Sequence, residues 1–215
     1  MAQQTLKGIT LKFSLLLASI LLLLPQFAHA QTPTVIPGLE VIAERQYATD
    51  AGGTIDTQSE DVFLASARVY LFATPEDAET TWETLAAAES IEDDLDEGDD
   101  SVTYEKFEVE DIGDRAMVIS LSAEISDGET GAFRTMMIQQ GTRIVTVTAI
   151  AGSVEAAEIA DDIATAMIER EPGESEPVYD GNGASAGGVW EVFLPADAEV
   201  LGDLRAYADK ETRPA

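Results

Sequence analysis

Residues 115–152, RAMVISLSAEISDGETGAFRTMMIQQGTRIVTVTAIAG, contain three apolar segments separated by short polar turns. In the first segment, Ala116–Ser126, apolar residues occupy every second position, a period that places alternate residues on opposite faces of a β-sheet. Ala132–Gln139 and the β-branched Arg143–Ala151 are also typical of strands. The loop Asp127–Gly131 and the turn after the second segment are too short for a parallel crossover, so we expect an antiparallel three-strand meander.

The third segment of the meander is apolar on both of its faces. Val145 and Val147 lie on one face, and Ile144 and Ile150 lie on the other. A sheet that is apolar on both faces must be covered on both, so we expect helices to pack against it.

Three further strands and two helices are predicted around the meander. The strands are Gly38–Ala48, which we expect at an edge of the sheet, Val62–Ala73 and Val102–Val109. The first helix begins with Thr74 as its N-cap and Pro75 at its first helical position, and continues to about Leu95. The second helix follows Ser153 and continues to about Arg170.

This order of elements resembles a known family of domains. Together with Ile112–Ala116 and Gln140–Val145, it is similar to the PsbP/Mog1-type domains of exported bacterial proteins over roughly Pro37–Glu171. The resemblance implies an α+β fold, in which two helices pack on a curved antiparallel sheet with the meander at its centre. It also implies a non-catalytic binding or assembly role, and it provides no catalytic residues to carry over.

The chain divides into four parts by composition. Residues 1–30 are typical of a signal peptide, 31–171 form a single α+β domain, and 172–188 are a linker rich in Gly and Pro. Residues 189–215 contain a strand, Val189–Leu194, and a short amphipathic segment with Leu201, Leu204 and Tyr207. We expect this apolar tail to dock on the domain as an edge strand; the alternative is that it is offered to a partner by strand addition.

The first thirty residues predict export. Lys7 and Lys12 precede the apolar run Phe13–Leu24, and Ala28–Ala30 fits a small-x-small cleavage site. We therefore expect a secreted or periplasmic protein, cleaved near Ala30. The alternative is an uncleaved membrane anchor, although the run is shorter than the ~20 residues of a spanning helix. Because no cysteine follows the run, we exclude a bacterial lipoprotein anchor.

The protein is strongly acidic. Its formal net charge is −29, and without residues 1–30 it has 10 basic and 41 acidic residues, a net charge of −31. Such a chain repels nucleic acid and anionic membranes, and favours cations or basic partners. The alternative interpretation is that the charge maintains solubility in a salty or acidic medium.

The missing residue types limit the chemistry. The chain has no cysteine, and its one histidine, His29, lies in the predicted signal peptide. The exported chain then lacks thiolate nucleophiles, disulfides, the usual zinc ligands and the usual base of a serine triad. We expect a non-enzymatic binding or assembly module without a cofactor, whose partner is another envelope or extracellular protein or a cationic ligand. The alternative is a carboxylate-based hydrolase, for which two acids must flank the bond.

The acidic run Glu92–Asp100 suggests a cation site but does not fit an EF-hand. A loop that begins at Asp93 or at Asp94 fails to place both the ligands and Gly98 as that motif requires. A weak divalent-cation site remains an alternative. Its candidate ligands are Asp93, Asp94, Asp96, Asp99 and Asp100.

Four apolar residues are the other candidates. Trp82 lies on the apolar stripe of the first helix, where we expect it to anchor the core rather than stack on a ligand. An apolar pocket lined by Trp82, Phe133, Met136 or Met137 would indicate binding of a small ligand.

Overall fold

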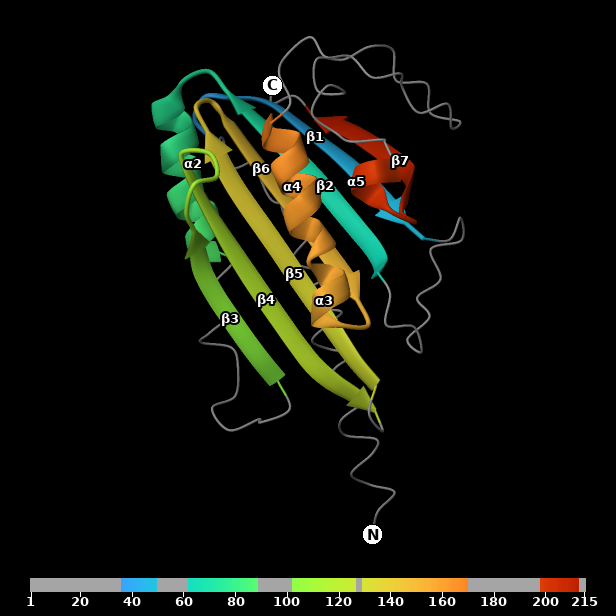
Figure 1. Cartoon of the computed structure of the whole chain (residues 1–215). Helices are drawn as coiled ribbons and strands as arrows, with labels where there is room; N and C mark the ends of the chain where they lie inside the picture. The colour runs from blue at the N-terminus through green and yellow to red at the C-terminus, as the bar shows by residue number, and fades with distance from the viewer. Residues whose placement is uncertain (1–35, 50–61, 89–101, 127–128, 170–197, 213–215) are drawn as a thin grey trace.

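The computed structural model describes residues 36–49, 62–88, 102–126, 129–169 and 198–212 (Figure 1). These residues form one large antiparallel sheet with a few helices on its two faces. The fold is therefore a mixed α+β fold, as the sequence predicts at this level. None of the helices in the described residues is long and apolar enough to span a membrane.

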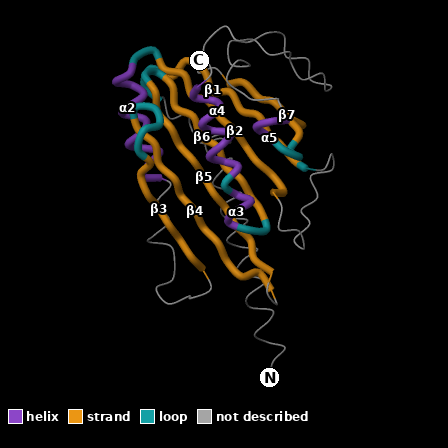
Figure 2. The backbone as a smooth tube through the Cα atoms, viewed as in Figure 1, coloured by secondary structure: helices purple, strands orange, loops and turns teal. Residues whose placement is uncertain are grey.

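The sheet has seven strands in the order β3-β4-β5-β6-β2-β1-β7. The backbone trace in Figure 2 shows these strands side by side, with helices on both sides of the sheet. Their bounds are β1 Leu39–Ala48, β2 Val62–Phe72, β3 Val102–Val109, β4 Arg115–Ser126, β5 Glu129–Gln140, β6 Arg143–Ala151 and β7 Arg205–Thr212.

The meander predicted from the sequence forms strands β4, β5 and β6. Each is antiparallel to the next, with Met117 opposite Met137 and Ile138 opposite Val145. The first loop is shorter than predicted, because β5 begins at Glu129 rather than at Ala132 and Ser126 still pairs with Glu129. The ladder continues there because its hydrogen bonds join backbone groups and do not require apolar side chains.

Strand β1 is not an edge strand, so that prediction is wrong. It pairs with β2 on one side and with the C-terminal strand β7 on the other. The segment before β7 contains the one-turn helix α5 (Ala198–Leu201), and Leu201 and Leu204 are buried against the sheet. The expected amphipathic tail is therefore a helical turn followed by a strand. The predicted strand Val189–Leu194 lies outside the described residues.

Helix α2 (Pro75–Ala88) begins where the sequence predicts. The hydroxyl of Thr74 accepts a hydrogen bond from the backbone N–H of Asp77 at 3.2 Å, which caps the first turn. Its predicted continuation to Leu95 lies outside the described residues.

The second predicted helix is divided into α3 (Val154–Ala157) and α4 (Ile159–Glu169). Ser153 caps α3 as expected, and its hydroxyl accepts from the N–H of Ala156 at 3.1 Å. The prediction of one continuous helix is wrong because the N–H of Glu158 bonds to the carbonyl of Glu155, an i→i+3 bond that tightens the last turn of α3.

The helices cover opposite faces of the sheet. On the α4 face, α3, α4 and α5 bury residues such as Val118 and Val145. On the α2 face, helix α2 buries Met117 and Ile144 together with Trp82. The prediction that both faces of the meander are covered is confirmed, and so is the expectation that Trp82 belongs to the core.

Candidate functional site

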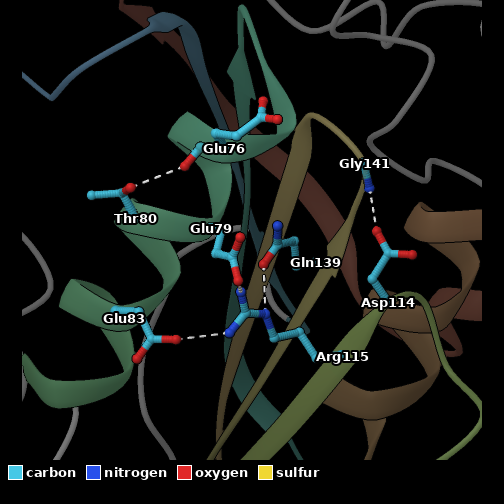
Figure 3. A network of polar contacts seen from close by, with 8 residues as sticks. All are labelled: Glu76, Glu79, Thr80, Glu83, Asp114, Arg115, Gln139 and Gly141. Carbon is cyan, nitrogen blue, oxygen red and sulfur yellow. Dashed lines mark hydrogen bonds and ion pairs between the residues drawn. The ribbon is translucent and has the colours of Figure 1, made fainter.

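Arg115 ties helix α2 to the sheet (Figure 3). Its guanidinium donates to Glu83 at 2.8 Å and to Gln139 of β5 at 2.8 Å, and lies 3.1 Å from Glu79. The same group lies 5.4 Å from the centre of the Trp82 ring, within the range of a cation–π contact. These contacts are structural, because they join the first long helix to the centre of the sheet.

Two further basic residues bind the C-terminal ends of helices. Lys106 of β3 donates to the backbone carbonyl of Ala86 at 3.0 Å, and Arg143 of β6 donates to the carbonyl of Ile168 at 3.3 Å. Neither α2 nor α4 has a basic residue in its own last turn. The strands therefore supply the positive charge that the negative end of each helix dipole favours.

The turn before β4 packs on the turn between β5 and β6. The carboxylate of Asp114 accepts from the N–H of Gly141 at 2.6 Å (Figure 3). The N–H of Asp114 also donates to the carbonyl of Gln139 at 2.7 Å. Gly113 has φ 61°, and a Cβ there would lie 2.5 Å from the same carbonyl oxygen. The two motifs on which the family resemblance is based thus contact each other and have a structural role.

The α2 face carries another ion pair, between the paired strands β1 and β2. The Nε of Arg68 lies 2.8 Å from Glu44, and both side chains are mostly buried. Burial by itself would raise the pKa of Glu44, but the charge and hydrogen bond of Arg68 lower it below its usual value. Nearby, the hydroxyls of Thr135 and Thr148 lie 2.9 Å apart. These groups bond to one another inside the protein, so they offer little to a partner.

The surface beside β3 is different, because charged and aromatic groups meet there at the edge of the sheet. Arg134 of β5 binds both carboxylate oxygens of Asp161 of α4, at 2.9 and 2.5 Å. Glu105 of β3 lies in the same cross-strand row as Arg134, with Ser120 of β4 between them. The hydrogen bond to Asp161 raises the pKa of Arg134 above its usual value, against the opposing effect of burial.

Phe107 of β3 is exposed next to this ion pair. Phe107 is 43% exposed, and among the large apolar residues whose side chains the structure describes only Val154 is also exposed. The guanidinium carbon of Arg134 lies 5.9 Å from the centre of its ring. The charge of Glu158 also acts on Arg134. We call the set Glu105, Phe107, Arg134, Glu158 and Asp161 the β3 surface.

The β3 surface combines an apolar ring with an acidic rim. The ring is held by a guanidinium that is itself fixed to α4, so the aromatic contact is preorganised. Three carboxylates surround a single positive charge, and the local charge is therefore negative. Single exposed apolar side chains are common on protein surfaces, but an aromatic ring held in place by a fixed guanidinium is a candidate anchor for a partner.

The structure does not test the predicted cation site. The candidate cation ligands Asp93, Asp94, Asp96, Asp99 and Asp100 lie outside the described residues. Within the described part of the chain, no group of three or more acidic, His or Cys side chains is arranged to hold a metal ion.

The four candidate pocket residues do not all lie on one face of the sheet. Met136 belongs to the core of the α4 face, whereas Trp82, Met137 and Phe133 lie on the α2 face. Met136 and Met137 are consecutive in a strand, so their side chains necessarily point to opposite faces. All four are buried.

Sequence reasoning did not identify the β3 surface. Val102–Val109 was predicted as an ordinary strand, and Phe107 was one apolar residue in its alternation. The charge pattern gave no signal for it, because the face of Phe107 has one charge, Glu105, whereas the face of the less exposed Tyr104 has two, Lys106 and Glu108.

Comparison with known proteins adds no functional assignment. No protein-family model matches the sequence, and no curated protein matches it. A crystal structure of "Protein of Unknown Function PA94" from Pseudomonas aeruginosa is similar to this chain at 13% identity and a TM-score of 0.33. The similarity covers 70% of this chain and 94% of that one.

Proposed function

We propose that this protein is a non-enzymatic binding or assembly module that contacts its partner through the β3 surface. The observation that supports this most directly is the exposed ring of Phe107, fixed on Arg134 beside carboxylates at the edge of the sheet. Burying an exposed Phe side chain contributes on the order of 2 kcal/mol to an interface. The acidic rim favours a partner surface that places no further carboxylate opposite it.

The proposed location of the protein is the periplasm or the extracellular medium. The basic start, apolar run and cleavage pattern of residues 1–30 support it. The PsbP/Mog1-type resemblance agrees with this proposal, since such domains occur in exported bacterial proteins. The partner that we expect is another envelope or extracellular protein.

The other two candidate functions have less support. A carboxylate hydrolase needs two acids at a defined separation across a substrate cleft. On the β3 surface the acid best fixed in position, Asp161, is occupied by Arg134. Cation binding through residues 92–100 involves the part of the chain that is not described, and it stays a prediction.

Photocrosslinking from position 107 tests the proposed function. A photoreactive benzoylphenylalanine replaces Phe107 in the full chain, and the native host cells are irradiated. We expect a reproducible crosslinked protein. The matched control places the same residue at Thr84, an exposed position of α2 on the opposite face, and should give no such product. If position 107 yields no product, or the same products as position 84, the proposal is wrong.

A further inference from the structure

Strand β3 presents an open edge. In the part of the chain that the structure describes, β3 lies at one end of the strand order and pairs only with β4. This pairing runs from Val102 to Val109 without a register shift. The strand also contains no Pro and no Gly. Its outer edge is therefore a regular row of backbone donors and acceptors, which another strand can extend.

The opposite edge of the sheet is less suitable. The pairing of β7 with β1 shifts register between Gln46 and Tyr47. Phe107, one of the exposed large apolar residues, lies on β3. Irregular edges of this kind protect sheets against strand addition.

We propose that the partner of the β3 surface is a second copy of this chain, paired antiparallel through β3 with Phe107 opposite Phe107. This inference rests on the proposed function, because it uses the same surface. A two-fold axis perpendicular to the sheet makes both faces continuous between the copies. On the α4 face the two Phe107 rings then become cross-strand neighbours, as aromatic pairs favour.

The charges on the α2 face match in this register. Lys106 of each copy lies opposite Glu108 of the other, so the two-fold axis generates two pairs of opposite charge. Lys106 also donates to the carbonyl of Ala86, but an ammonium group has three donors and can serve both.

Neighbouring registers are less favourable. Residues that lie directly opposite each other must have their side chains on the same face of the sheet. The two β3 strands can therefore slide past each other only by steps that keep even-numbered residues opposite even-numbered ones. One such slide places Lys106 opposite Lys106, and the next places Glu105 opposite Glu105. Like charges directly opposite each other destabilise strand pairing. The register centred on Phe107 avoids both contacts.

A charge swap tests the register. The dimerisation constant is measured by sedimentation velocity on protein purified from cells that express the full chain. Lys106→Glu and Glu108→Lys should each weaken dimerisation about tenfold, because two attractive pairs per dimer become repulsive. The double variant should return to within about threefold of the wild type. Lys210→Gln on β7 removes a positive charge at the other end of the sheet and should leave the constant unchanged.

The double variant separates pairing between copies from misfolding. Lys106→Glu also removes the bond to Ala86 at the end of α2, and a change at position 108 cannot restore that bond. Recovery in the double variant therefore supports the register. A wild-type protein that stays monomeric up to about 0.5 mM, a concentration that permits even weak association, overturns the inference. A double variant weaker than both single variants does the same.

Failure of the inference and failure of the proposed function give different results. A product of twice the chain mass from the crosslinker at position 107 supports both. A product with a different protein, from a chain that sediments as a monomer, supports the proposed function and overturns the self-pairing. The absence of any crosslinked product contradicts both.

Discussion

Gly113→Ala should destabilise the protein far more than Gly141→Ala. Both glycines have a left-handed backbone, with φ 61° at Gly113 and 55° at Gly141. The space around them differs. A Cβ at Gly113 would lie 2.5 Å from the carbonyl oxygen of Gln139, whereas a Cβ at Gly141 would meet nothing within 4 Å. Gly141→Ala therefore serves as a control that has the backbone strain without the clash.

The two costs can be estimated separately. The left-handed conformation costs an alanine about 1–2 kcal/mol at either site, and the reduced entropy of the unfolded chain offsets about 0.4–1 kcal/mol of this. Gly141→Ala should thus lower the free energy of unfolding by about 1 kcal/mol. At Gly113 the backbone of Gln139 must also move, which adds about 1–3 kcal/mol of overpacking. The same shift strains the hydrogen bond of 2.7 Å that the N–H of Asp114 donates to the carbonyl of Gln139. This strain lowers the free energy of unfolding by about 1 kcal/mol more.

Urea unfolding followed by far-UV circular dichroism measures the difference. The midpoint should fall slightly for Gly141→Ala and much further for Gly113→Ala, with similar m-values. The expected gap between the variants is about 2–4 kcal/mol. If the two variants agree within about 0.5 kcal/mol, the usual range for a surface change, the turn before β4 does not pack on Gln139 and the reasoning is refuted.

Two further predictions concern the ion pairs. Arg134→Met should lower the free energy of unfolding by about 1–2 kcal/mol, since Asp161 loses a bidentate partner but is 28% exposed, so water compensates in part. In a urea double-mutant cycle with Asp161→Asn the two effects should not add, and additive effects would contradict the contact. The pKa of Glu44 is lowered in the folded protein, so its ion pair with Arg68 stabilises the fold. This stabilisation is complete above the unfolded-state pKa of about 4.3 and is lost as the pH falls below that value. The stability difference between the wild type and Glu44→Gln, from thermal melts, should be constant above about pH 5 and shrink below about pH 4; a difference that persists unchanged to about pH 3 would contradict this assignment.

The meander could be predicted because its information is local. A period of two over Ala116–Ser126 and short turns rich in glycine define neighbouring antiparallel strands without reference to the rest of the chain. The start of α2 was predicted for the same reason, since Thr74 and Pro75 fix the first turn through contacts within a few residues.

The remaining features depend on distant parts of the chain. The position of β1 inside the sheet follows from pairing with β7, more than 150 residues later in the sequence. The division of the second helix at Glu158 depends on a single i→i+3 bond rather than on composition. The exposure of Phe107 depends on how far α3 and α4 extend across the sheet, which no strand pattern can indicate.

The basic residues explain both the stability of this acidic fold and the place where a second copy can approach. Arg115, Arg134 and Arg143 project from strands and bind helices, so the helix surfaces remain rich in acid. Two such surfaces repel each other at long range. Lys106 also binds a helix, the end of α2, but it lies on the end strand β3, where it can face Glu108 of a second copy. Self-association along β3 therefore combines backbone pairing, the Lys106–Glu108 pairs and the ring of Phe107, which together can outweigh the repulsion between two acidic chains.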